Sequence, residues 1–198
     1  MPRSSWPGGV IVVALLFTAS SAEARRLRVE PWVYDPAHSG AVTSDWRPFS
    51  GRGEADPALL LAKLLPTSQD AAAGATVEGV RGLVLGELGF DVYGGGHCGA
   101  GAPRFNVTLV DGTIYFFGCA YGTHTRSPTK PGTFTRIRFS DGDAFKQLAT
   151  DPPWPGFGRA RVASIEIVFD EGTDVGSGFT ALDDIDVNGE LIGRGHDD

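Results

Sequence analysis

Short runs of alternating hydrophobic and polar residues recur along the chain, with the period of two that is typical of β-strands. The clearest run is 162–169, where Ile165, Ile167 and Phe169 alternate with Ser164, Glu166 and Val168. Another strand is predicted at 179–187, after a glycine-rich acidic turn, and another at 134–139. The segment 77–92 contains two more, separated near Gly86 or Gly89.

An Asp-Gly pair at 111–112 lies between alternating runs at 105–109 and 114–118. In this setting Asp-Gly predicts a β-hairpin with a two-residue turn, because both central residues of that turn take positive φ. The predicted register places Leu109 opposite Ile114, Val107 opposite Phe116, and Phe105 opposite Gly118.

Helix is expected in few places. Asp56-Pro57 before the run ALLLAKLL has the form of an N-cap with proline at the first helical position, and Pro66 would end such a helix. Because the leucines of this run lie on more than one helical face, a buried strand is the alternative. Asp143 is the predicted cap of a single turn at 144–149.

These patterns predict an all-β fold of about eight strands, arranged as a two-sheet β-sandwich that is jelly-roll-like and has one or two short helices. The 28 glycines and 13 prolines among 198 residues supply the many turns that such a fold needs. The net charge of −7 argues against a nucleic-acid or anionic-membrane surface, which would need clustered positive charge.

The first 24 residues have the pattern of a secretory signal peptide. Arg3 precedes an apolar run at 9–19, and Ala22 and Ala24 fit the small-residue rule for signal peptidase. We therefore predict cleavage after Ala24, a single domain at 25–198, and a secreted protein that is extracellular or periplasmic. A retained membrane anchor is the alternative, although the run is short for a membrane span.

Export changes the interpretation of the two cysteines. Cys98 and Cys119 are expected to form a disulfide, because an oxidising compartment favours that state. The alternative is a metal site built from His97, Cys98, Cys119 and His124, but this spacing matches no usual zinc pattern.

The C-terminal segment ALDDIDVNG at 181–189, preceded by VASIEIVFDEG, resembles the closing strands of bacterial secreted jelly-roll modules of the galactose-binding-like and carbohydrate-binding-module type. The resemblance covers roughly the last thirty residues. It implies a sugar-binding or adhesive accessory module, sometimes with structural calcium.

Asp183 is the candidate metal ligand. Strand alternation places five residues on the expected core face: Phe179, Ala181, Asp183, Ile185 and Val187. A buried carboxylate needs a partner. Calcium is one answer, with Asp170, Glu171 and turn carbonyls as further oxygen ligands. Backbone N–H groups or an arginine are the other, and no other cofactor is expected.

The glycine-rich loop at 94–103 has neither the Gly-Lys-Ser ending nor the following helix of a phosphate cradle. A Cys98–Cys119 disulfide would bring His97, Arg104, Tyr121 and His124 to one end of the hairpin, where they would bind a ligand or abstract a proton. Trp154, in the loop DPPWPGFG, is a further candidate binding residue, although aromatic residues in sandwiches more often fill the core.

The expected function is therefore non-catalytic binding of carbohydrate or another extracellular surface ligand. A small polysaccharide-active enzyme of the lyase kind and a structural or adhesive envelope protein are the two alternatives.

Overall fold

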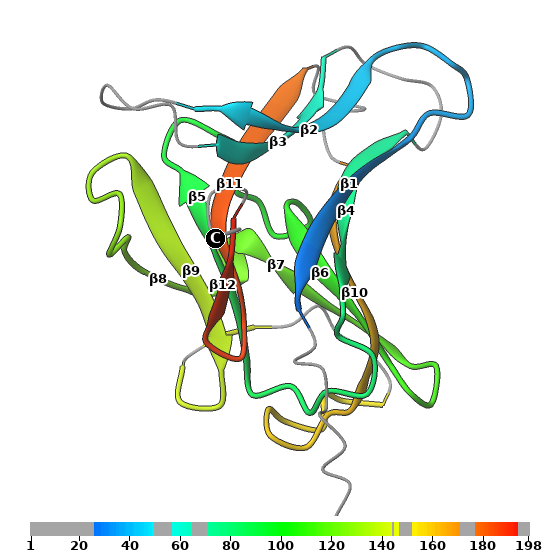
Figure 1. Ribbon diagram of the computed structural model, residues 1–198, viewed down its shortest axis with the longest axis vertical. Helices are drawn as coiled ribbons and strands as arrows, with labels where there is room; N and C mark the ends of the chain where they lie inside the picture. Colours follow the sequence, from blue (N-terminus) through cyan, green and yellow to red (C-terminus); the bar gives the residue numbers. More distant parts are fainter. Residues whose placement is uncertain are drawn as a thin grey trace, which may run out of the picture.

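A computed structural model describes residues 26–49, 57–64, 71–143, 145–146, 152–170 and 177–193. These residues form two antiparallel sheets packed face to face, which confirms the predicted all-β sandwich (Figure 1). In this part of the chain the one helical element is the 3-10 turn η1 (Cys119–Tyr121). The predicted signal peptide lies outside the described residues, as does most of the predicted turn at 144–149.

The sheets contain twelve strands within the described ranges, more than the eight expected. The five-stranded sheet has the order β1 (Arg28–Tyr34), β4 (Ala72–Glu78), β10 (Val162–Phe169), β6 (Arg104–Leu109) and β7 (Ile114–Gly118). The seven-stranded sheet has the order β2 (Val42–Pro48), β3 (Pro57–Lys63), β11 (Gly178–Val187), β5 (Glu87–Tyr93), β9 (Phe134–Ser140) and β8 (Thr123–Arg126), and β12 (Glu190–Ile192) pairs with β11.

The helix expected after Asp56 is wrong, and the alternative of a buried strand is what forms. Pro57–Lys63 is β3, which hydrogen-bonds β2 on one side and β11 on the other. Leu59 and Leu61 are fully buried in the core between the sheets, while Ala58 is buried on the opposite face. Pairing on both edges and burial on both faces explain why a continuous apolar run, rather than an alternating one, makes this strand.

The β6–β7 hairpin is correct in place but shifted in register. Leu109 accepts a hydrogen bond from the N–H of Gly112 (2.9 Å) and donates its own N–H to Thr113 (2.8 Å), so the loop has three residues. Gly112 has a φ of +89°, whereas Asp111 has no positive φ. The turn therefore corresponds to a type I turn followed by a left-handed glycine. The observed partners are Val107 with Tyr115 and Phe105 with Phe117, and all four are buried.

A bulge in β11 overturns the predicted single core face of that strand. Pairing with β5 shifts between Asp183 and Asp186, and Asp184 has a φ of +43°. Leu182 lies in the core before the bulge and Ile185 after it. Asp183 therefore lies on the outer face of the seven-stranded sheet, not in the core as predicted, and the bulge changes which residues face outward.

The predicted disulfide is confirmed. Cys98 and Cys119 are bonded, with Cα atoms 5.2 Å apart and a sequence separation of 21 residues. The bond ties the glycine-rich loop after β5 to the end of β7. Cys119 is fully buried in the core cluster, so the bond also anchors that loop against the packed interior.

Candidate functional site

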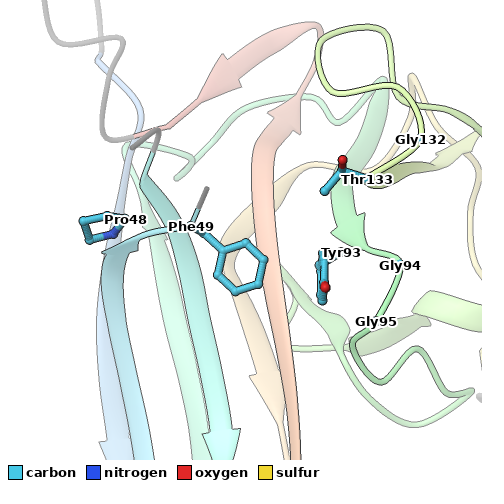
Figure 2. A pocket seen from close by; sticks show the side chains of 7 residues that line it. All are labelled: Pro48, Phe49, Tyr93, Gly94, Gly95, Gly132 and Thr133. Atoms are coloured by element: carbon cyan, nitrogen blue, oxygen red, sulfur yellow. The ribbon is translucent and has the colours of Figure 1, made fainter. Parts of the chain in front are cut away.

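The outer face of the seven-stranded sheet is hollowed where three chain segments meet. The hollow has a volume of about 750 Å³. Its walls come from the end of β2, the end of β5 and the turn before β9. The described lining residues are Pro48, Phe49, Tyr93, Gly94, Gly95, Gly132 and Thr133. Figure 2 shows the Phe49 ring pointing toward Tyr93, with Thr133 beside Tyr93. We call this feature the aromatic hollow.

Tyr93 is the central residue of the aromatic hollow. It is the last residue of β5 and pairs with Phe134 in β9. Its ring centroid lies 4.7 Å from that of Phe49 at an interplanar angle of 71°, and 5.9 Å from that of Phe134. Edge-to-face packing of this kind fixes ring orientation. Tyr93 and Phe49 are both partly exposed, and both line the hollow.

Glycines at the two turns allow the chain to lie close to the Tyr93 ring. A Cβ atom placed on Gly95 would lie 2.6 Å from Cε1 of Tyr93, so a larger residue there would displace the ring. The N–H of Gly94 donates to the carbonyl of Thr133 (2.9 Å), which joins the two turns. Gly132 has a φ of +87°, in the left-handed region that glycine favours.

Beside the aromatic hollow, the same sheet face holds a buried polar network. Asp91 pairs in register with Arg136 in β9 and with Asp183 in β11. Nη1 of Arg136 donates to Asp91 Oδ1 (3.3 Å) and to the carbonyl of Asp184 (2.7 Å), and its Nη2 donates to Asp186. Both Asp91 and Asp186 are buried, so Arg136 provides the charge that the two carboxylates need.

The segment after β8 is attached to this network by side chains at 127, 129 and 130. Ser127 donates to Asp91, Thr129 donates to Asp184 (2.6 Å), and Nζ of Lys130 pairs with Asp183. Lys130 Nζ also lies 5.3 Å from the centroid of the Phe134 ring. We call residues 127–133 the strap, because it runs from the network to the wall of the aromatic hollow.

Burial perturbs two carboxyls of the network. Burial raises the pKa of Asp91, and the Ser127 hydrogen bond and the Arg136 charge oppose that rise. Burial likewise raises the pKa of Asp186, opposed by Arg136 and by the N–H of Gly189. Desolvation disfavours the ionised form, so each group is easier to protonate than an exposed aspartate.

The structure places Tyr121 and His124 close to the disulfide. Tyr121 is the last residue of η1, which begins at Cys119, and Nε2 of His124 donates to the carbonyl of Cys119 (3.0 Å). His97 is exposed at the start of the bonded loop, and its ring centroid lies 5.9 Å from that of Phe169. Ligand binding by these three residues stays a prediction.

Arg104 and Trp154 have structural contacts of their own. Arg104 makes a bidentate pair with Asp170, with N···O distances of 2.7 and 2.8 Å, and its guanidinium lies over Phe116. Trp154 packs edge-on against Tyr115 and Phe117, with centroids 5.0 and 5.1 Å away. The Trp154 ring therefore packs on the core rather than standing out as a flat loop platform.

The candidate calcium ligands have partners from within the protein. Asp170 is paired with Arg104, and Asp183 accepts from the N–H of Asp184 (2.8 Å) as well as pairing with Lys130. Glu171 lies outside the described residues. In the described part of the chain, no group of three or more His, Cys, Asp or Glu residues has the arrangement of a metal site. Calcium binding stays a prediction.

The sequence pattern alone did not indicate Phe49, Thr133 or the strap as functional residues. These residues come from segments that are remote in sequence, and neither a spacing nor a motif links them. The signal that was available was the presence of glycine next to aromatic residues at 93–96 and 132–134.

Comparison with known proteins gives no family. No family model and no curated protein matches the chain. Among solved structures, the crystal structure of a β-1,2-glucanase from Parabacteroides distasonis aligns with 81% of this chain and 22% of that chain, at 14% identity and a TM-score of 0.39. The chain thus spans less than a quarter of that protein, and a score this low does not establish a common function.

Two further findings concern location. Within the described ranges, no helix has the length and apolar character needed to cross a membrane. The Cys98–Cys119 disulfide is consistent with a location outside the cytoplasm.

Proposed function

We propose that this protein is an exported binding module that holds a carbohydrate in the aromatic hollow without altering it chemically. The observation that carries the proposal is the pair of partly exposed aromatic residues, Phe49 and Tyr93, at a hollow whose other described walls are Pro48, Thr133 and glycine turns. Ligand sites in proteins typically combine aromatic walls with a few polar groups that fix orientation. Here the phenol of Tyr93, the hydroxyl of Thr133 and the peptide groups of the glycine turns provide the polar groups.

The same geometry favours binding over catalysis. The described residues that line the aromatic hollow include no carboxylate, imidazole or amine that would act as a general acid or base. Asp183, on the same sheet face, is buried and paired with Lys130. Among these described lining residues the phenol of Tyr93 is the one proton-transfer group, whereas glycoside hydrolysis ordinarily needs two carboxylates.

A glycan array with fluorescently labelled protein tests the proposal. We expect folded wild-type protein to bind at least one glycan class, and Tyr93→Ala to lose that signal by tenfold or more. Tyr34→Ala is the matched control, because Tyr34 is an exposed tyrosine at the end of β1 in the other sheet. Each variant is first checked by its thermal melting temperature.

Two results would overturn the proposal. One is a folded wild-type protein that binds no glycan, which would favour a structural or adhesive role. The other is a Tyr93→Ala variant that binds as well as wild type. Including Tyr121→Ala in the same array tests the disulfide end: loss of signal there, with Tyr93→Ala unaffected, would move the site to Tyr121 and its neighbours.

A further inference from the structure

We infer that the ligand of the aromatic hollow is a neutral glycan rather than an anionic polysaccharide. This inference rests on the proposed function and concerns the charge of the ligand at the same site. The evidence for it is the distribution of ionisable groups around the hollow. The argument for carbohydrate binding did not depend on that distribution.

The lining itself lacks a group to neutralise an acidic sugar. The described lining residues are proline, aromatic, glycine and threonine side chains, none of which is charged at neutral pH. Recognition of a carboxylate or sulfate in proteins ordinarily uses arginine or lysine, because charge-assisted hydrogen bonds compensate the lost hydration of the anion. A uronate bound here would lose water without gaining such a partner from these residues.

Three cations lie close in sequence to the described wall of the hollow, and each is paired with a carboxylate. Arg47, next to Pro48, is exposed and lies 3.6 Å from Asp45. Lys130, two residues before Gly132, pairs with Asp183 and lies over the Phe134 ring. Arg136, two residues after Phe134, is nearly buried and bonded to Asp91 and Asp186. Turning Lys130 or Arg136 toward an acidic ligand would leave a buried carboxylate without its cation, which is strongly unfavourable.

The network behind the hollow has an excess of acidic groups. Four buried aspartates face two cations, Lys130 and Arg136; these aspartates are Asp91, Asp183, Asp184 and Asp186. Asp91 lies two residues before Tyr93 on the same face of β5, which corresponds to about 7 Å along the strand. At that separation an ionised aspartate repels an anionic ligand appreciably, even with partial screening. The excess of carboxylates over cations in the network therefore disfavours an anion at the hollow.

The test compares each neutral glycan that binds with a uronate oligosaccharide of the same length and linkage, by isothermal titration calorimetry. Pairs include tetramers of β-1,4-linked glucose and glucuronic acid, and of mannose and mannuronic acid. We expect the neutral member to bind at least about tenfold more tightly. We also expect its Kd to change less than about twofold between low and high salt, because it carries no charge for ions to screen.

A charge introduced into the wall provides a second readout. Thr133→Lys places an amine at the hollow and is expected to reduce the preference for the neutral member several-fold. Thr108→Lys is the matched control on β6, in the other sheet, and is expected to leave the preference unchanged.

The outcomes separate the two proposals. Equal or tighter binding of the uronate member by wild-type protein overturns this inference and leaves carbohydrate binding intact. An equal effect of Thr133→Lys and Thr108→Lys also contradicts it, because the charge preference would then arise away from the hollow. If folded wild-type protein binds no glycan, the proposed function fails and this inference fails with it.

Discussion

Replacing Arg136 should lower the free energy of unfolding, because this residue is bonded to two buried aspartates of the network. We consider Arg136→Met, which keeps most of the side-chain length and removes the guanidinium. The variant loses the donor to Asp91 (3.3 Å), the donor to the carbonyl of Asp184 (2.7 Å) and the donor to Asp186. Two buried carboxylates are then left without their cation, and breaking a buried ion pair in this way costs about 3–5 kcal/mol.

The cost of Arg136→Met should depend on pH with a defined sign. Burial raises the pKa of Asp91 and Asp186 above the ordinary value of 3.8, and Arg136 opposes that rise. Without Arg136 both values rise further. The folded state then takes up protons more readily than the unfolded state, so stability increases as the pH falls from 7 toward about 4. The loss in unfolding free energy is therefore largest at pH 7 and shrinks on acidification.

Urea unfolding followed by tryptophan fluorescence at pH 7 and pH 5 measures both effects. Arg138→Met is the control, because Arg138 is about half exposed (49%) and pairs with Glu87 at 3.1 Å and Asp143 at 3.4 Å. An exposed pair of this kind contributes about 0–1 kcal/mol. The reasoning is refuted if Arg136→Met costs no more than Arg138→Met, or if its cost is the same at both pH values.

Three further substitutions are predicted to separate stability from binding. Trp154→Ala should lower the unfolding free energy by about 3 kcal/mol in urea titrations, because the ring packs on the aromatic core. Glycan binding by the folded fraction should stay at the wild-type level. Lost binding at unchanged stability would instead identify Trp154 as a binding residue. Gly95→Ala should weaken glycan binding about tenfold, or about 1.4 kcal/mol, because the Cβ of the alanine would displace the Tyr93 ring. The melting temperature should change little. Unchanged affinity by calorimetry would count against the Tyr93 ring as the binding surface. Replacing Cys98 and Cys119 together by serine should cost about 3 kcal/mol of stability, and an unchanged unfolding midpoint would show that the bond constrains the unfolded chain little.

The strands that could be predicted from sequence are those with one buried face and one face that is at least partly exposed to solvent. In β10 the residues Ile165 and Ile167 are fully buried while Ser164 and Glu166 are partly exposed, so the alternation is visible in the chain itself. In β3 both faces are buried, so the sequence shows no alternation. A continuous apolar run of this kind fits a helix as well as a strand.

Register and bulges depend on single backbone conformations that composition does not reveal. The shift of the β6–β7 hairpin follows from a third loop residue, and the change of face in β11 follows from the positive φ of Asp184. The disulfide was predictable because export and a cysteine count of two leave one intramolecular pairing. The aromatic hollow was not, because the pairing of β5 with β9 and the return of the strap bring its walls together from remote segments.

The central claim, that ligand binds between the turns at 93–95 and 132–133, is tested most directly by chemical-shift mapping of the backbone amides. Wild-type protein labelled with ¹⁵N is titrated with a neutral oligosaccharide that the array identifies. We expect the largest shifts on Gly94, Gly95, Gly132 and Thr133, and no shift of Thr108 on the other sheet. Largest shifts at Tyr121 and His124, with these four amides unchanged, would contradict it.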